Sequence, residues 1–127
     1  MTILLVTRRI VTGEAMSESE KSLYNSKENV LKELLLNYGI NSTEHQRRQL
    51  LKHIELLIEI NKNLNLTRIT SVDDALVLHI LDSLLPLKVC NEFLSDTHNY
   101  IDIGTGGGFP GLPLAIMSNN KTLLVDS

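Results

Sequence analysis

Apolar residues recur at helical spacing through most of this chain and at strand-like spacing only near its end. The recurrence of Leu31, Leu34 and Leu35 predicts a first helix over residues 26–38, for which Gly39 supplies a left-handed stop. A second helix is predicted over residues 43–63, because Thr43 with Gln46 three residues later forms a capping box. Its long apolar stripe consists of Leu50, Leu51, Ile54, Leu57 and Ile58.

A third helix and two short strands are predicted in the second half of the chain. Ser71 and Asp74 open the helix, and Pro86 interrupts or ends it. Strand signals cover residues 100–103 and 123–125, with a helix over about residues 110–118 between them. Strand, helix, strand at this length is a βαβ unit, so the two strands should be parallel. We therefore expect an α/β chain in which helices precede one βαβ unit.

Three segments of different character divide the chain. Residues 1–25 are expected to be a poorly ordered lead-in, and Met16 opens a more natural start than Met1, so residues 1–15 are interpreted as a spurious upstream extension. Residues 26–95 form a helical N-terminal region. Residues 96–127 begin a second, glycine-rich domain that carries the strand signals.

Composition excludes several classes of protein. No apolar run is long enough to span a bilayer, so we expect no membrane association. The single cysteine permits no intrachain disulfide and favours the cytoplasm, and the scattered histidines lack the spacing of a metal site. A net charge of −3 does not indicate nucleic-acid binding, and the basic residues between Glu44 and Arg68, which include Arg47, are interpreted as a solvated helix face.

The most informative segment is the glycine-rich turn between the first strand and the next helix. Gly104, Gly106 and Gly108 let the backbone turn tightly and approach a ligand closely, and a following helix N-terminus adds N–H donors. So many glycines in so few residues cost too much ordering entropy for an ordinary connection, although a turn without a ligand stays open. The pattern therefore predicts a cofactor-binding loop.

Two cofactors compete for this loop. Gly106, Gly108 and Gly111 fit G-x-G-x-x-G, the dinucleotide fingerprint. Asp102 with the glycines that follow fits D-x-G-x-G-x-G, which resembles the loop of S-adenosylmethionine-dependent methyltransferases. Asp102 favours the methyl donor, because an acid repels a pyrophosphate and suits an ammonium and a sulfonium. Asp126, 22 residues after Gly104, can take ribose hydroxyls in either cofactor.

Four segments in a fixed order resemble one family of enzymes. They are Asn61-Lys62-Asn63-Leu64-Asn65-Leu66-Thr67, His79-Ile80-Leu81-Asp82-Ser83, the stretch from Asp102 to Leu114, and Leu124-Val125-Asp126-Ser127. Together they resemble the RsmG family, also called glucose-inhibited division protein B, over roughly residues 26–127. The resemblance implies a bacterial, cytoplasmic methyltransferase acting on guanine N7 of small-subunit ribosomal RNA, free or in the subunit particle. It also implies the start of a Rossmann-like methyltransferase fold.

The resemblance also assigns roles to single residues. It implies that Gly104 and Phe109 contact S-adenosylmethionine, that Gly106 and Gly108 shape the loop, and that Asp126 faces the ribose. His79 and Asp82 fall on the signature helix, where they orient the loop, line the guanine site, or serve only in capping and packing. Asn65 and Thr67 would form a turn that positions Arg68. Leu78 stands where many members carry an arginine, which weakens an RNA contact at that position.

Guanine N7 carries a lone pair and no proton, so attack on the methyl group needs no general base, and we expect no catalytic acid–base pair.

Family members continue well past residue 127. We therefore expect the chain to be an N-terminal fragment or a truncated gene product that ends within the Rossmann-like domain. On its own it should be poorly stable and without turnover. The alternatives are a methyltransferase for a small molecule or protein, and a non-catalytic cofactor-binding module.

Overall fold

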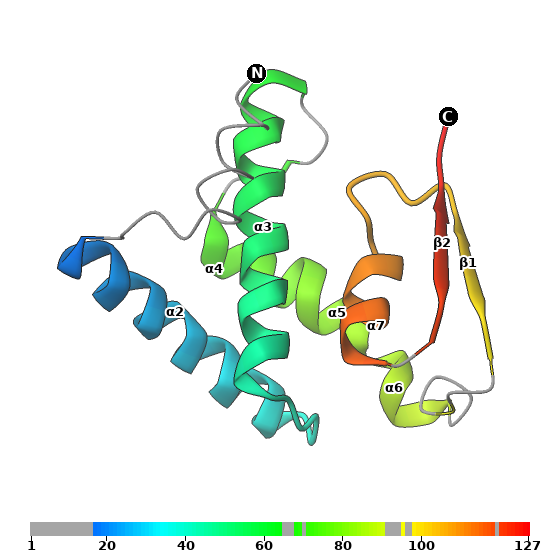
Figure 1. The fold of residues 1–127 in the computed structure, drawn as a ribbon, viewed down its shortest axis with the longest axis horizontal. Helices are drawn as coiled ribbons and strands as arrows, with labels where there is room; N and C mark the ends of the chain where they lie inside the picture. Colours follow the sequence, from blue (N-terminus) through cyan, green and yellow to red (C-terminus); the bar gives the residue numbers. More distant parts are fainter. Residues whose placement is uncertain (1–16, 65–67, 70, 91–94, 96–97, 119) are drawn as a thin grey trace.

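Two long helices pack against one another at the N-terminal side of the molecule (Figure 1). The structure, a computed structural model, describes residues 17–64, 68–69, 71–90, 95, 98–118 and 120–127. Helix α2 covers Glu18–Asn37 and helix α3 covers Glu44–Leu64. Gly39 adopts φ +71° and ends α2, and Thr43 and Gln46 exchange the two hydrogen bonds of a capping box at the start of α3, as predicted.

Helix α2 begins at Glu18, well before the start that we predicted near Ser26. Its polar first turns are supported by contacts that the sequence pattern does not show. Within residues 18–25, the hydroxyl of Tyr24 donates to the backbone oxygen of Arg48 on α3 at 3.1 Å, and just beyond them Lys27 pairs with Asp73 at 2.6 Å. The extension of α2 over residues 18–25 therefore depends on its neighbours more than on its own apolar stripe.

The predicted third helix consists of four short segments. These are α4 (Val72–Ala75), the π-helix η1 (Leu76–Leu81), α5 (Asp82–Leu84) and α6 (Pro86–Val89). Ser71 caps the first segment by accepting from the backbone N–H of Asp74, and Pro86 occupies the first turn of α6, where its missing N–H costs nothing. Their buried side chains join those of α2 and α3 in one core, which includes Leu31, Leu35, Leu50, Ile54, Leu76, Ile80 and Leu84.

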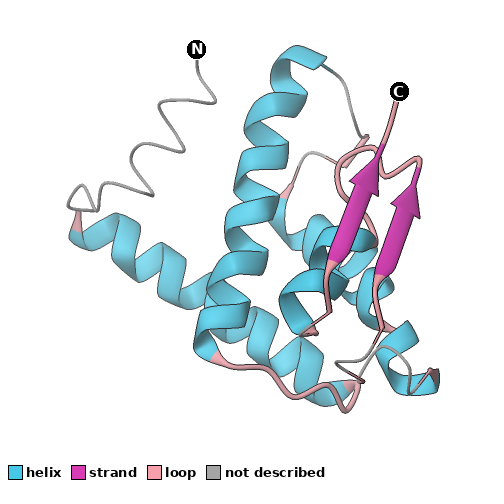
Figure 2. Ribbon diagram, turned by 45° about the vertical axis from the view of Figure 1, so that its right-hand side comes forward, coloured by secondary structure: helices cyan, strands magenta, loops and turns pink. Residues whose placement is uncertain are grey.

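The strands lie at the opposite side of the molecule from α2 (Figures 1 and 2). Strand β1 (Tyr100–Ile103) pairs in parallel with β2 (Thr122–Val125), in a register that places Asp102 beside Leu124. Helix α7 (Gly111–Met117) connects them and packs between the sheet and the remaining helices. The predicted parallel βαβ unit is confirmed, and the described part of the chain is mostly helical with a two-stranded sheet.

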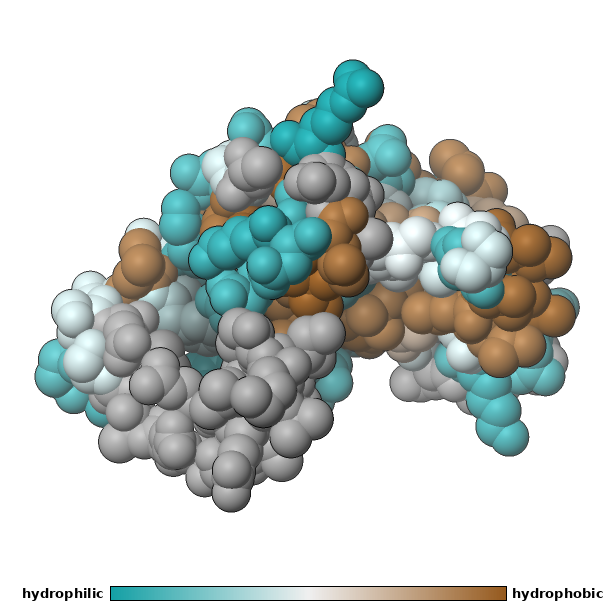
Figure 3. Space-filling view, turned by 90° about the horizontal axis from the view of Figure 1, so that it is seen from above, coloured by the Kyte–Doolittle hydropathy of each residue, from teal (hydrophilic) through white to brown (hydrophobic). Residues whose placement is uncertain are grey.

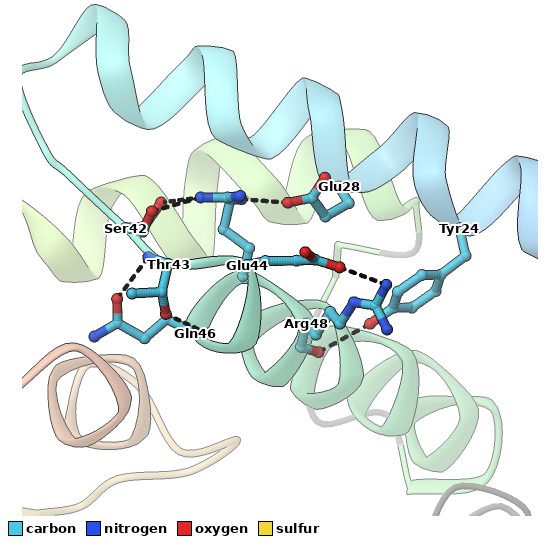
Figure 4. A network of polar contacts seen from close by, with 8 residues as sticks. Tyr24, Glu28, Ser42, Thr43, Glu44, Gln46 and Arg48 are labelled. Atoms are coloured by element: carbon cyan, nitrogen blue, oxygen red, sulfur yellow. Dashed lines mark hydrogen bonds and ion pairs between the residues drawn. The ribbon is translucent and has the colours of Figure 1, made fainter. Parts of the chain in front are cut away.

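One buried ion pair joins α2 to α3 (Figure 4). The guanidinium of Arg47 is paired with Glu28 and also donates to the backbone and side-chain oxygens of Ser42. Both side chains are largely buried, at 8% and 14% exposed. The interpretation of this charge as part of a solvated face was wrong for Arg47, because α2 covers it.

The face of the sheet that points away from α7 is apolar and exposed. Side chains alternate along both strands, so one set faces α7 and the other faces solvent. The outward set is Ile101, Ile103, Leu123 and Val125, which are 64%, 81%, 58% and 41% exposed. We call these residues the bare sheet face; Figure 3 shows apolar surface gathered on this side of the molecule.

Candidate cofactor-binding loop

The residues between β1 and α7 form a tight loop whose conformation requires glycine. We call residues 104–109 the glycine loop. Gly104, Gly106 and Gly108 have φ values of +77°, +56° and +94°, in the region that side chains disfavour. Within the loop, the backbone nitrogens of Gly108 and Phe109 donate to the carbonyl of Thr105 at 2.9 and 3.2 Å. The loop therefore turns back on itself before α7 begins.

Asp102 joins the two ends of this loop. Its Oδ2 accepts a hydrogen bond from Thr105 Oγ1 at 2.8 Å and another from the backbone N–H of Gly111 at 2.9 Å. A Cβ on Gly111 would lie 2.6 Å from this oxygen and 2.3 Å from a methyl carbon of Leu124. Asp102 thus organises the turn, and the first N–H of α7 is directed to Asp102.

Strand β2 holds the loop from the other side. The carbonyl of Val125 accepts from the backbone nitrogens of Gly104 and Thr105, at 2.7 and 3.2 Å. The next residue, Asp126, accepts from the backbone N–H of Gly106. This bond and those from Ser127 lower the pKa of the Asp126 carboxyl, so the residue is an exposed carboxylate at the end of β2.

Two histidines from different helices meet the aromatic ring of the loop. His53 of α3 and His79 of η1 both stack on Phe109, with ring centroids 4.5 and 4.3 Å apart and interplanar angles of 19° and 10°. His53 Nε2 also lies 2.7 Å from the carbonyl oxygen of Gly107. The π-helical turn presents His79 to the loop; such turns are frequent at functional sites.

Burial favours the neutral form of both imidazoles. Desolvation lowers the pKa of His53, the hydrogen bond to Gly107 opposes this, and the nearby His79 adds to the lowering. Desolvation also lowers the pKa of His79, against an opposing effect of the Asp82 carboxylate. Neutral rings stack on an aromatic ring without the cost of burying charge.

The remaining predicted residues are less closely connected with the loop. Asn65 and Thr67 lie outside the described residues, so the predicted turn stays a prediction. Arg68 is exposed. Asp82 is exposed at the start of α5, where its backbone N–H donates to the carbonyls of Val77 and His79.

The loop leaves room for a ligand where a cofactor is predicted. A Cβ placed on Gly104 or Gly106 meets no atom within 4 Å, so both positions face open space. The Asp126 carboxylate borders the same side through its bond to Gly106. An open backbone edge beside an exposed carboxylate fits the amino-acid and ribose parts of a nucleoside cofactor. Among the residues that the structure describes, no cluster of metal-ligating side chains occurs and no helix is long and apolar enough to cross a bilayer.

Sequence reasoning missed His53. It was grouped with the scattered histidines, yet it lies three residues after Leu50 and four before Leu57, on the apolar stripe of α3. A histidine on a buried helical stripe must find a hydrogen-bond partner, and this position was the available signal.

Comparison with known proteins gives a consistent family. The model of the rRNA small subunit methyltransferase G family, GidB, matches residues 46–127. The ribosomal RNA small subunit methyltransferase G 1 of Syntrophobacter fumaroxidans is 44% identical over 68% of this chain and 38% of its own length. The methyltransferase G of Actinobacillus pleuropneumoniae serotype 5b is 46% identical over 76% of this chain and 45% of its own.

A third relative, from Lactobacillus johnsonii, is 36% identical over 73% of this chain and 39% of its own length. No solved structure matches the chain significantly. The chain thus spans 38–45% of the length of these curated relatives.

Proposed function

Since the chain belongs to the rRNA small subunit methyltransferase G family, we propose that it supplies the cofactor loop of an S-adenosylmethionine-dependent methyltransferase. The substrate is guanine N7 of small-subunit ribosomal RNA, presented free or in the subunit particle in the bacterial cytoplasm. The fold to which this βαβ unit belongs is the Rossmann-like methyltransferase domain. Because the chain spans less than half of its relatives, the proposed activity belongs to the longer protein.

The observation that carries this proposal is the open backbone at Gly104 and Gly106 beside the carboxylate of Asp126. Each oxygen of a carboxylate accepts more than one hydrogen bond, so Asp126 can bind ribose hydroxyls while it holds Gly106. Gly104 offers a backbone that a ligand can approach without meeting a side chain. Asp102 accepts hydrogen bonds from Thr105 and Gly111, which supports a structural role in the loop. This role is additional to the proposed attraction between its carboxylate and the ammonium group of the cofactor.

The proposed methyl transfer needs no side chain that acts as a catalytic acid or base. S-adenosylmethionine, when bound, would supply the methyl group of its sulfonium. The N7 lone pair, which carries no proton, would form the new N–CH3 bond as the S–CH3 bond breaks and S-adenosylhomocysteine leaves. Residues of this chain then contribute by holding the cofactor in line with the base. The stack of His79 on Phe109 supports the loop-orienting role for His79 over a role at the guanine.

Calorimetric titration tests the cofactor. We expect the 127-residue chain to bind S-adenosylmethionine and not NAD, and Asp126→Ala to weaken that binding. Binding of NAD alone would overturn the methyltransferase proposal in favour of a dinucleotide-binding module.

Methylation of subunit particles tests the substrate. Particles from cells that lack the native enzyme are incubated with the complete gene product and labelled cofactor. Label on guanine N7 supports the proposal, and label only on a protein or small molecule contradicts it. Cofactor binding without any transfer by the complete product identifies a non-catalytic module.

A further inference from the structure

His53 ties the middle of the glycine loop to helix α3. Its imidazole Nε2 lies 2.7 Å from the carbonyl oxygen of Gly107, a residue 54 positions later in the chain. The same ring stacks on Phe109. The side chain is buried, with 9% of its surface exposed. One residue of α3 therefore makes both a polar and an aromatic contact with the loop.

The geometry fixes the tautomer of this histidine. A carbonyl oxygen only accepts, so Nε2 carries the hydrogen and donates it to Gly107. Nδ1 is buried and has no hydrogen-bond partner among the described residues. A proton on Nδ1 would place an unsatisfied charge in the interior. It is therefore the neutral imidazole of His53 that holds the loop.

The backbone of the loop fits closely against α3 at this point. A Cβ on Gly107 would lie 2.8 Å from a methyl carbon of Leu57, and one on Gly108 would lie 3.1 Å from His53 Nε2. Gly104, Thr105 and Gly106 are held by β2 through Val125 and Asp126. His53 and Leu57 therefore support the half of the loop that the strands do not hold.

We propose that His53 is a positioning residue for the cofactor, which holds the Gly107–Phe109 half of the glycine loop in its binding conformation. This inference rests on the proposed cofactor function. His53 does not touch the cofactor; it acts through the carbonyl of Gly107 and the ring of Phe109. A preorganised loop binds more tightly, because the ordering entropy is not lost on binding.

Two substitutions separate the hydrogen bond from the ring. His53→Gln places an amide N–H near the position of Nε2 and loses the aromatic ring. His53→Phe keeps a ring on Phe109 and loses the donor. His45→Gln is the matched control, since His45 lies on the same helix with an exposed side chain.

Two measurements on the 127-residue chain decide the question. Calorimetry gives the dissociation constant for S-adenosylmethionine, and amide hydrogen exchange of residues 104–109 without ligand gives the order of the loop. For His53→Phe we expect a roughly 3- to 10-fold weaker affinity and faster exchange confined to the loop, from the loss of one hydrogen bond. His53→Gln should recover a large part of both, and His45→Gln should match the parent chain.

Other outcomes overturn the inference. Unchanged affinity and loop exchange in His53→Phe would remove any positioning role. Exchange that rises equally across the helices would show that His53 serves only global stability, and failure of His53→Gln to improve on His53→Phe would contradict the role of the Gly107 bond. If the parent chain binds no S-adenosylmethionine, loop exchange in the variants alone decides whether His53 positions the loop; if the complete gene product binds none either, the proposed function fails.

Discussion

The carboxylate of Asp102 lies 2.9 Å from the backbone nitrogen of Gly111, so the strand that enters the glycine loop is bonded directly to the helix that leaves it. The same oxygen accepts from Thr105 within the loop. An acid that the sequence indicated as a partner for the cofactor therefore also closes the turn. The two roles are separable by experiment.

Asp102→Ala removes the acceptor of both hydrogen bonds. Because the site is partly buried and the acceptor is charged, we expect the free energy of unfolding to fall by about 2–3 kcal/mol in urea denaturation. Asp102→Asn keeps an oxygen acceptor and should lose about half as much. A weaker affinity for S-adenosylmethionine in Asp102→Asn, beyond its loss of stability, would reveal a charge contribution to binding. Parent-like stability of Asp102→Ala would contradict the closing role.

Gly111→Ala places a methyl group where Asp102 and Leu124 already lie. We expect it to lower the free energy of unfolding by about 1–3 kcal/mol, since backbone and strand must shift to admit it. Gly106→Ala is the matched comparison, because its Cβ meets nothing within 4 Å and its cost is the strain of φ +56° alone, about 1 kcal/mol. Thermal unfolding of both variants measures the difference. A smaller loss in Gly111→Ala than in Gly106→Ala would be inconsistent with this packing.

Arg47→Ala leaves the carboxylate of Glu28 buried without its partner. We expect a loss of about 3–5 kcal/mol in the free energy of unfolding. Replacing both residues, as Glu28→Leu with Arg47→Met, should recover most of that loss. The exposed pair of Lys21 and Glu18 provides the control, and Lys21→Ala should cost under about 1 kcal/mol. Similar losses for Arg47→Ala and Lys21→Ala would mean that the buried pair is not important for stability.

Because the pKa of His53 is lowered in the fold, we expect the chain to lose stability in mild acid. Its pKa in the fold is below the ordinary 6.5, so the unfolded chain takes up the proton first, and stability falls as the pH drops from above 6.5 through the folded pKa. His79, which faces His53 from η1 and is itself influenced by Asp82, acts in the same direction. The loop and α7 carry no ionisable side chain between Asp102 and Lys121.

Urea denaturation at pH 7.5 and 5.5 measures this effect, and the comparison with His53→Gln isolates the contribution of His53. The pH dependence of the variant is subtracted from that of the parent because two other groups also have shifted pKa values. Burial raises the pKa of Glu55 above 4.5, which acts in the opposite sense as the pH rises past that value. The lowered pKa of Asp126 acts only as the pH falls below about 3.8. An equal pH dependence in the parent and His53→Gln would show that folding does not lower the pKa of His53.

The bare sheet face predicts self-association of the isolated chain. Ile103→Thr combined with Leu123→Thr keeps residues that tolerate strands and removes apolar surface from this face. We expect sedimentation velocity to show a shift from larger species toward monomer. Val89→Thr, on α6 and 87% exposed, is the control for removing an exposed apolar side chain elsewhere. An equal shift in the control would argue against a specific role of the sheet.

Much of the fold could be predicted from local patterns. The capping box at Thr43, the stop at Gly39 and the parallel pairing of residues 100–103 with the second strand each depend on residues close in sequence or on chain topology. The early start of α2 could not be predicted, because Tyr24 finds its hydrogen-bond partner on α3. The burial of Arg47 was hidden for the same reason.

The candidate site shows the same division. The glycines and Asp102 form a contiguous motif, and Asp126 follows at a fixed spacing at the end of the next strand, so the chemistry of these residues is visible in the sequence. His53 was not, because its partner lies 54 residues away and a single histidine on a helix has no recognisable spacing. The sequence identified His79 and Asp82 only through a family resemblance, and the stack on Phe109 defines how His79 meets the loop.

The two strands also impose an order on synthesis. Strand β1 and all glycines of the loop leave the ribosome before residues 122–126, yet the carbonyl of Val125 and the carboxylate of Asp126 hold Gly104, Thr105 and Gly106. The helices contact α3 and one another without these residues, so they can assemble first. The glycine loop therefore acquires its shape only after the nascent chain has delivered the end of β2.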